Sequence, residues 1–435
     1  MKLPLSTLAL LASGVSAQLA FPGAEGMGRN ALGGRQGEVY KVTNLNDSGE
    51  GSLRDAVSQP NRIVVFDVGG VIDISERIVV ESNIYIAGQT APGGGITVYG
   101  NGWSWSDADD SIVRYVRIRM GKGGTSGKDA ITIASGSRLI FDHVSVSWGR
   151  DETFSISGDA ANVTVQDSII AQGLETHSCG GLMETDGGIS LFRNLYVDNN
   201  TRNPKVKGVN DFQNNASIPV QTKFSFIGVM LTPPNQVVYN WGHGGGYIAG
   251  DSDGQSYANI INNYYISGQS TSVTAFTRGN ANFHAFVQDN YYDPDPDGTL
   301  AGSPLCEEST CYSSIDFQAA PYDYPGPETL HTAEEAVEVV LAGAGASLVR
   351  DAVDTGLVEE VRSWGTAGVL ISDEADVGGP GEVAGGDAPV DSDGDGIPDE
   401  WETVNGLDPN DASDGMVIAE NGYANLENYV NSLVA

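Results

Sequence analysis

The chain has 435 residues, 40% of them hydrophobic, so it can bury a substantial core in one large domain or in a few smaller ones. Its 57 acidic and 22 basic residues give a formal net charge of −35, which makes nucleic acid an unfavourable partner. The 57 glycines exceed ordinary usage and indicate many turns or a tightly coiled architecture.

The first 17 residues, MKLPLSTLALLASGVSA, have the features of a secretory signal. A lysine precedes an apolar run of roughly ten residues, and small residues follow it, which predicts cleavage after Ala17. The run is too short to span a bilayer, and no later stretch is long and apolar enough to do so. We therefore expect a secreted protein that does not bind membranes.

Extracellular chemistry also fits the sequons and two of the three cysteines. The predicted glycosylation positions are Asn46, Asn162, Asn199 and Asn215. Cys306 and Cys311 are close enough in sequence for a local disulfide. Cys179 is then left over, and we expect it to be buried and inert, with a catalytic role as the alternative.

Short β-rich runs recur from about residue 60 to 295, with no long amphipathic helices between them. Comparable points in four consecutive runs, Tyr115, Phe141, Val165 and Leu191, are 26, 24 and 26 residues apart. This period indicates a solenoid in which each coil covers the apolar face of the next. We predict an all-β fold, a right-handed parallel β-helix over residues 18–370.

Asparagine recurs in the runs FRNLYV, VVYNW, INNYY and QDNYY. These residues form either an internal ladder of stacked amides or turns that favour the left-handed backbone conformation.

Three further segments follow the repeats. Residues 329–364 have helical periodicity, with a capping box predicted from Thr332 to Glu335, and we expect them to cap or pack along the solenoid. Residues 371–390 are rich in glycine, proline and acids, which predicts a flexible linker with little to bury. Residues 391–435 form a small C-terminal tail.

The tail begins with DSDGDGIPDEWE, residues 391–402, which matches the EF-hand-like pattern D-x-D-x-D-G-x5-E. The predicted Ca²⁺ ligands are Asp391, Asp393, Asp395, the carbonyl of Ile397, Asp399 and Glu402. An exposed acidic turn is the alternative. A second copy has Val417 and Ala419 at its first two ligand positions, so we expect no second ion. Stability, spacing or attachment is the expected role of the tail.

Three stretches of the solenoid concentrate polar side chains: GKDAITI (127–133), FDHVSVSWGRDE (141–152) and TRNPKVKG (201–208). The last brings three cations within six positions of an otherwise acidic chain, which is typical of a local site for an anion. On a strand, Lys205 and Lys207 share one face.

These stretches carry a resemblance to a known family. IFDHVSVS is similar to the WIDH signature of the pectate lyase superfamily, with Phe141 in place of tryptophan. TRNPKVK resembles the R-x-P-x-x-R/K segment that carries the catalytic arginine of that family, although Lys207 stands where many relatives have arginine. KDAITI resembles the strand that presents a calcium-binding aspartate. The resemblance covers roughly residues 18–370 and implies a calcium-dependent lyase that acts on pectate.

The resemblance implies roles for the basic residues. Arg202 would remove the C5 proton of a galacturonate, while Lys207 and Lys205 would bind substrate carboxylates. A free guanidinium has a pKa above 12, so Arg202 is a base only where neighbouring cations lower that pKa.

It also implies a calcium ion beside Arg202, held by Asp129 and Asp151 with Glu152. An exposed turn is the alternative for the last two residues. We interpret Asp142 and His143 as a buried structural pair that links adjacent coils, with direct chemistry as the alternative. His177 is a candidate at the edge of the substrate cleft, with a satisfied core histidine as the alternative.

Two other functions compete with a lyase. A hydrolase on the same fold needs a pair of positioned carboxyl groups, and Asp151–Glu152 is the only adjacent acid pair near the proposed site. A non-catalytic β-helix that binds carbohydrate needs no base beside a metal. We expect a monomer with pectate as its partner.

Overall fold

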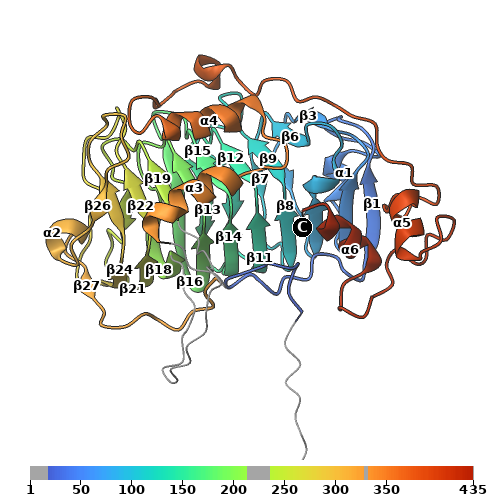
Figure 1. Cartoon of the computed structure of the whole chain (residues 1–435), viewed down its shortest axis with the longest axis horizontal. Helices are drawn as coiled ribbons and strands as arrows, with labels where there is room; N and C mark the ends of the chain where they lie inside the picture. Colours follow the sequence, from blue (N-terminus) through green and yellow to red (C-terminus); the bar gives the residue numbers. More distant parts are fainter. Residues whose placement is uncertain (1–17, 213–235, 328–331, 435) are drawn as a thin grey trace, which may run out of the picture.

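The computed structural model describes residues 18–212, 236–327 and 332–434. They form an elongated parallel β-helix whose coils follow one another along a single axis (Figure 1). Phe141 lies opposite Val113 of the preceding coil and Val165 of the next, so the predicted fold is confirmed. The predicted spacing between the first two runs was wrong by two residues, because Val113 and not Tyr115 lies opposite Phe141. Tyr115 follows its strand in the left-handed conformation, with φ 55°.

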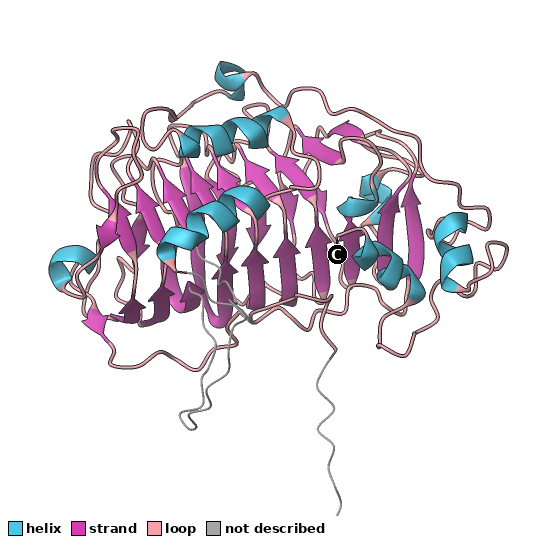
Figure 2. Cartoon of the chain, in the orientation of Figure 1, coloured by secondary structure: helices cyan, strands magenta, loops and turns pink. Residues whose placement is uncertain are grey.

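Two sheets build the walls of the solenoid (Figure 2). The larger contains two columns of strands. The first column is β1 (Glu38–Val42), β2 (Arg62–Phe66), β5 (Ile84–Ala87), β8 (Ser111–Arg114), β11 (Ser137–Asp142), β14 (Ala161–Gln166), the ends of β16 (Cys179–Phe192) and β18 (Lys205–Phe212), β21 (Ser256–Ile261), β24 (Phe283–Gln288) and β27 (Asp316–Phe317). The second column is β4 (Ile78–Val79), β7 (Trp103–Ser104), β10 (Ile131–Ile133), β13 (Glu152–Ser157), the beginnings of β16 and β18, β20 (Tyr247–Ala249) and β23 (Phe276–Thr277).

The smaller sheet is the third column. It consists of β3 (Gly70–Asp73), β6 (Ile96–Tyr99), β9 (Val116–Arg119), β12 (Ser145–Ser147), β15 (Ile169–Ala171), β17 (Leu195–Val197), β19 (Val237–Tyr239), β22 (Tyr264–Ile266), β25 (Tyr291–Asp293) and the antiparallel β26 (Ser303–Pro304). Side chains from all three columns fill the interior, where Val113, Phe141 and Val165 are fully buried. Each such side chain contributes about 1.5–3 kcal/mol by burial.

Buried amides form a ladder at one corner of the coils, the first of the two alternatives for the recurring asparagines. Its rungs are Asn194, Gln236, Asn263 and Asn290, each bonded to its neighbour in the next coil. Asn240, in the run VVYNW, differs from the other recurring asparagines. Its backbone is left-handed, with φ 51°, and its amide donates to Asp198 Oδ1 at 2.6 Å. It therefore lies in the turn that follows β19, at a different corner of the coils.

The segment before β1 crosses the outer face of the first column, from later coils back to earlier ones (Figure 1). The Met27 N–H donates to Ser190 Oγ at 3.1 Å, and the Gly34 N–H donates to Asn83 Oδ1 at 2.9 Å. A Cβ on Gly28 would lie 2.1 Å from the carbonyl oxygen of Leu139, so glycine permits this close crossing.

Helices cover the third column where helical periodicity was predicted. α3 (Ala333–Gly343) and α4 (Ala352–Arg362) share one apolar cluster with the third-column strands (Figure 1). The capping box of α3 is present, with bonds of 3.1 and 3.2 Å between Thr332 and Glu335. The other short helices of the solenoid are α1 (Leu53–Ala56), η1 (Gly88–Thr90) and α2 (Ser309–Tyr312).

Residues 371–390 differ from the expectation of a linker with little to bury. They contain η2 (Glu374–Val377), where the carboxylate of the buried Glu374 accepts a hydrogen bond from the Tyr99 hydroxyl at 2.7 Å. Further along, the Gly94 N–H donates to the Ala384 carbonyl at 2.8 Å. These contacts tie the segment to the early coils, because polar groups of the segment satisfy polar groups of the solenoid.

The tail also packs on the solenoid. Its helices are α5 (Asp399–Asn405) and α6 (Asn425–Ser432). Their apolar side chains share a cluster with the outward-facing residues of the early first column (Figure 1). Lys41 of β1 lies 2.9 Å from the carboxylate of Asp391, which adds an ion pair to this contact.

Several expectations concern single residues. Cys306 and Cys311 form the expected disulfide, and Cys179 is free and buried. Asn46 and Asn162 are exposed, whereas Asn199 is fully buried and its amide is bonded to the preceding coil. We therefore withdraw Asn199 as a glycosylation position.

The predicted signal, residues 1–17, and Asn215 lie outside the described residues. Within the described ranges, no helix has the length and apolar character needed to cross a membrane.

Candidate active site

Parallel pairing gathers the predicted acids and Arg202 at the beginning of the second column. Glu152 starts β13 and lies opposite Cys179, which starts β16 and lies opposite Thr201. Asp129 stands two residues before β10, at the level of Glu152 on the neighbouring strand. Paired strands are about 4.8 Å apart, so residues far apart in the sequence become neighbours here.

Arg202 and Glu152 are in direct contact. The guanidinium Nη1 forms an ion pair with Glu152 Oε1. The side chain of Glu152 is buried, whereas that of Arg202 is 28% exposed. Arg202 has a left-handed backbone, with φ 58°, and its carbonyl accepts a hydrogen bond from the Gly181 N–H at 2.7 Å. The proposed base therefore contacts a predicted metal ligand, and Glu152 does not lie in an exposed turn.

Asp129 is held by two hydrogen bonds. Its Oδ1 accepts from the Glu152 N–H at 3.2 Å and its Oδ2 accepts from the Thr132 hydroxyl at 2.8 Å. Burial raises the pKa of Asp129 to about 6; the Thr132 hydrogen bond opposes this shift and the negative charge of Asp151 adds to it. A cation close to this carboxylate would favour its ionised form.

Asp151 links the acidic residues to His177. Its Oδ1 lies 2.6 Å from His177 Nδ1, and the His177 side chain is 62% exposed. The alternative of a satisfied core histidine is therefore wrong. His177 stands on the surface beside the acidic cluster, where it can reach a bound molecule.

Lys205 and Lys207 lie two residues apart on β18, partly exposed, as their spacing predicted. The Nζ of Lys205 is 3.3 Å from Asp251, and that of Lys207 is 2.7 Å from Glu184. Both acid partners are about 40% exposed, so solvent weakens these ion pairs. An incoming anion can replace the acids at modest cost.

The acid cluster suits a hard cation. Ligand atoms of Asp151, Glu152 and Cys179 lie within 4.8 Å of one another. Carboxylate oxygens are preferred Ca²⁺ ligands, whereas burial raises the pKa of the Cys179 thiol to about 12, which keeps it protonated. Each carboxylate oxygen of Asp129 accepts one hydrogen bond and still has a lone pair with which it can bind a further partner. Asp151 and Glu152 thus offer clustered oxygens that suit calcium, and Asp129, which accepts from the Glu152 N–H, lies outside this set of clustered atoms.

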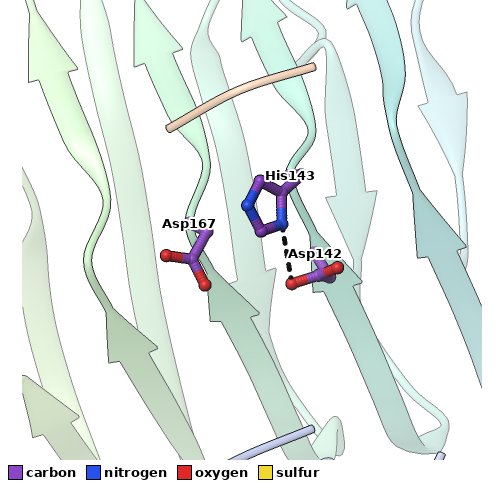
Figure 3. Close-up of side chains that lie close together, drawn as sticks. All are labelled: Asp142, His143 and Asp167. Carbon is purple, nitrogen blue, oxygen red and sulfur yellow. Dashed lines mark ion pairs between the residues drawn. The ribbon is translucent and has the colours of Figure 1, made fainter. Parts of the chain in front are cut away.

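Asp142 and His143 lie apart from these residues, at the end of a first-column strand (Figure 3). Asp142 Oδ1 is 3.0 Å from His143 Nδ1. Asp142 also accepts hydrogen bonds from Arg114 of the preceding coil at 2.7 Å and from Gln166 of the next at 2.8 Å. The pair links three coils, which supports its structural interpretation.

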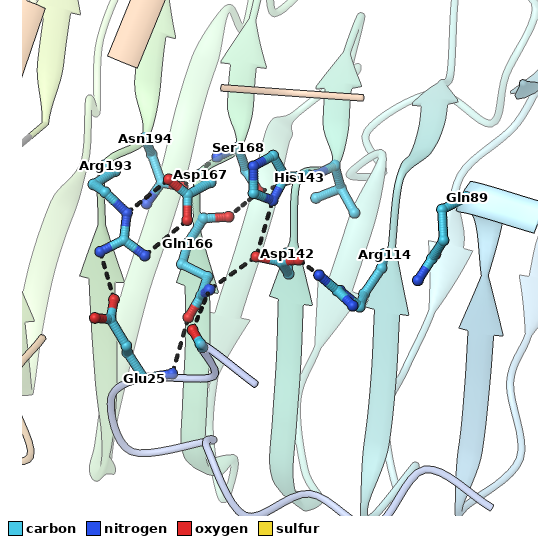
Figure 4. A network of polar contacts seen from close by, with 12 residues as sticks. Glu25, Gln89, Arg114, Asp142, His143, Gln166, Asp167, Ser168, Arg193 and Asn194 are labelled. Atoms are coloured by element: carbon cyan, nitrogen blue, oxygen red, sulfur yellow. Dashed lines mark hydrogen bonds and ion pairs between the residues drawn. The ribbon is translucent and has the colours of Figure 1, made fainter. Parts of the chain in front are cut away.

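The network continues into neighbouring coils (Figure 4). Arg193 donates to both oxygens of Asp167, at 2.6 and 2.7 Å, and pairs with Glu25 of the N-terminal segment. Atoms of Asp142, His143 and Asp167 lie within 4.8 Å of one another. Arginines already bind both carboxylates, which argues against a metal ion here.

This network affects the protonation of its members. Burial opposes a charge on His143, but the Asp142 and Asp167 carboxylates outweigh it and raise the pKa of His143 above its ordinary value. Burial acts to raise the pKa of Asp142, but His143 and Arg114 hold that pKa well below its usual range.

The tail contains a second acid cluster. Ligand atoms of Asp391, Asp393 and Asp395 lie within 4.8 Å of one another, as do those of Asp395, Glu402 and Asp414. Both carboxylate oxygens of Glu402, and one each of Asp393, Asp395 and Asp414, are buried without a hydrogen-bond partner. Burial and mutual repulsion raise the pKa of Glu402 to about 7. Oxygens left without partners fit a bound Ca²⁺.

The acid clusters of the tail differ from the predicted set of ligands at two positions. Asp399 belongs to neither cluster; its carboxylate accepts hydrogen bonds from the Ser392 N–H and hydroxyl, both at 2.7 Å. Asp414 lies outside the 12-residue motif, so pattern matching missed it. The feature of the sequence that accompanies Asp414 in this cluster is the glycine that follows it. A Cβ on Gly415 would lie 2.0 Å from Asp395 Oδ2. Ile397 places its side chain in the core.

Comparisons with known proteins agree with this fold. No protein-family model matches the chain. It is 65% identical over 430 residues to a probable pectate lyase C of Neosartorya fischeri, which covers 99% of this chain and 97% of that protein. It is 66% identical over 424 residues to a probable pectate lyase C of Aspergillus terreus, with 98% and 96% covered.

Among solved structures, the thermostable pectate lyase PL 47 superimposes with a TM-score of 0.51 at 14% identity and covers 78% of this chain and 100% of that one. This likeness concerns the fold alone. The β-helix and the full-length relatives define the class: the protein is a polysaccharide lyase. Within that class, the chain belongs to the pectate lyase C family.

Proposed function

We propose that this protein is an extracellular, calcium-dependent lyase that cleaves unesterified polygalacturonate by β-elimination. The contact between Arg202 and Glu152, beside two further carboxylates and two lysines, carries the proposal. A carbohydrate-binding protein has no need of a base in contact with an acid cluster.

Lys205 and Lys207 bind the substrate. A uronate carboxylate that approaches β18 exchanges with Asp251 and Glu184, whose ion pairs are solvent-exposed. A methyl ester lacks the charge that the lysines attract, so unesterified substrate is favoured.

Arg202 removes the C5 proton. The C5–H bond breaks and its electron pair forms the C4–C5 double bond, while the C4–O bond breaks and the leaving oxygen takes a proton from solvent. The proton from C5 resides on the guanidine of Arg202. Arg202 can act as this base only where cations offset the Glu152 carboxylate that contacts it.

Asp129, Asp151 and Glu152 would hold a calcium ion, which when bound stabilises negative charge on the substrate carboxylate and acidifies the C5 proton. His177, bonded to Asp151, is placed to contact substrate at the rim of this cluster.

A second calcium ion is proposed in the tail, on Asp391, Asp393, Asp395, Glu402 and Asp414. The buried oxygens without partners support it. Since this cluster lies against the early coils and away from Arg202, its role is structural.

Secretion is supported by the signal-like N-terminus, the Cys306–Cys311 disulfide and the two exposed sequons.

The test incubates the full chain with polygalacturonate and follows the ultraviolet absorbance of unsaturated uronate. We expect that absorbance to rise with calcium and to stop in excess chelator. Reducing ends without the absorbance would identify a hydrolase instead. Full activity in chelator would remove calcium from the mechanism.

A further inference from the structure

A groove of about 730 Å³ extends from Lys207 onto the neighbouring coil. Glu184, Asp186, Gln255 and Tyr257 are among its lining residues. Tyr257 is not used by the reaction described above, although its side chain faces the same groove as a proposed substrate-binding lysine. It is 37% exposed and is the one aromatic residue among the exposed large hydrophobic residues of the described chain.

The ring of Tyr257 is supported from the protein side. Tyr257 lies on β21 opposite Val209 of β18 and His284 of β24. Its ring stacks on the His284 ring, with centroids 5.2 Å apart and planes at 18°. The edge contact with Tyr322 has a centroid distance of 5.9 Å and an angle of 83°.

The supporting histidine is itself fixed. His284 Nδ1 lies 2.6 Å from Asp316 Oδ2, and its Nε2 lies 2.6 Å from Gln255 Oε1. The Tyr324 hydroxyl donates to the Tyr257 carbonyl at 3.3 Å. Tyr257 thus loses little conformational freedom when a ligand covers it, which lowers the entropic cost of binding.

The strand register places Tyr257 beyond Lys207, in the direction that leads away from Arg202. Arg202, Lys205, Lys207 and Val209 follow one another on one segment, and Tyr257 is level with Val209 on the next strand. From Lys207 the displacement is about 6.7 Å along the strand and about 4.8 Å across it. A polymer held at Arg202 and Lys207 therefore meets Tyr257 if it continues in the same direction.

The charges around Tyr257 differ from those around Arg202. Among the described residues that line the groove there is no cation besides Lys207, and Asp186 adds a negative charge to the lining. A carboxylate gains little here, whereas the apolar C–H face of a pyranose ring suits a rigid aromatic ring.

We propose that Tyr257 is the stacking platform of a remote subsite, which binds the apolar face of a sugar ring of a uronic-acid polymer beyond Lys207. This inference rests on the proposed function. It makes Tyr257 a residue through which the enzyme distinguishes long substrates from short ones. It binds through the ring face, so it accepts esterified and unesterified residues alike.

The experiment measures kcat and KM of the full-length enzyme on polygalacturonate and on trigalacturonate. Tyr257→Ala should raise KM for the polymer about tenfold, the change expected for an aromatic contact worth about 1.4 kcal/mol. Its kcat should stay at the wild-type value, and its KM for the trimer should change little. Tyr257→Phe keeps the ring and should restore the polymer KM. Val79→Ala, an exposed truncation on β4, is the control for surface effects.

An unchanged polymer KM in Tyr257→Ala would overturn the subsite, as would equal losses on polymer and trimer, since those indicate a structural role. A Tyr257→Phe variant as weak as Tyr257→Ala would assign binding to the hydroxyl and not to the ring. Calorimetric titration of polygalacturonate into Arg202→Lys, with and without Tyr257→Ala, tests binding without turnover. Absence of unsaturated product from the wild type refutes the proposed function, whereas equal affinities in this titration refute the subsite.

Discussion

Two clusters of arginine, carboxylate and histidine stand on neighbouring columns of the same sheet, and they differ in how their charges are satisfied. Around Asp142, each carboxylate oxygen has a protein partner, and the side chains of Asp142 and Arg114 are 1% and 5% exposed. Around Arg202, the guanidinium is 28% exposed, and the nearby lysines pair with solvent-exposed acids.

The difference separates a structural network from a binding site. Buried pairs are costly to break, because the remaining charge lies in a medium of low polarity. Exposed pairs exchange partners readily, so a ligand can take the place of one member. Residue types alone do not distinguish the clusters; the exposure and the saturation of each charge do.

Replacing Arg202 should give the largest effect. Arg202→Lys keeps the positive charge but moves the base, and loss of a positioned general base lowers kcat by about 10²- to 10⁴-fold. The rate of unsaturated product formation measures it. Arg362→Lys, in an exposed pair with Glu338 on the helices, is the matched control and should retain wild-type turnover. Wild-type kcat in Arg202→Lys would refute the assigned base.

Asp142→Asn should affect stability in the other cluster. The substitution leaves the charge of Arg114 buried without a counter-charge, and breaking a buried pair costs about 3–5 kcal/mol. Urea unfolding measures this loss. Glu338→Gln removes a partner of the exposed Arg362 and should change the unfolding free energy by about 0–1 kcal/mol. Equal effects of the two substitutions would contradict the comparison.

The acid clusters of the tail are a third case for this comparison. Their carboxylate oxygens that are buried without a hydrogen-bond partner have no protein cation as a partner among the described residues. Calcium at about 100 times the Kd of the tail site should stabilise the full chain by about 2.7 kcal/mol through that site, and Asp414→Asn should lose most of this contribution. Thermal unfolding with calcium and with chelator measures it.

Asp411→Asn is the matched control, because the Asp411 carboxylate bonds only to Ser413 among the described contacts. Asp399→Asn should retain the calcium response, because Asp399 is bonded to Ser392. A loss in Asp399→Asn with none in Asp414→Asn would restore the ligand set of the motif.

Local sequence patterns were enough to predict the fold, but they could not predict contacts that depend on long-range packing. The repeat period predicted the β-helix because pairing in register repeats the same apolar positions, as at Phe141 and Val165. The contact of Arg202 with Glu152 depends on the length of the intervening coils, which no motif records. Asp414 joins its cluster only because the tail folds back on itself, and the amide of the buried Asn199 is bonded to the preceding coil.

The smallest expected effect is the part of the pH dependence of stability that His143 contributes in the buried network. His143 faces Asp142, Asp167 and Arg114, and its ring stacks on Tyr115 with centroids 4.7 Å apart. Its pKa is raised in the folded protein, so the folded state holds the proton more tightly than the unfolded state does. The resulting stability is fully present below the unfolded pKa of about 6.5 and is lost as pH rises through the folded pKa.

Urea unfolding of the wild type at several pH values from about 5 to 9 should therefore show a steeper decline than His143→Gln shows. His243→Gln, at an exposed histidine, should keep the decline of the wild type. If His143→Gln instead followed the wild-type curve, the charge of His143 would have no part in holding the coils together. The Asp142–Arg114 pair would then account for the network without it.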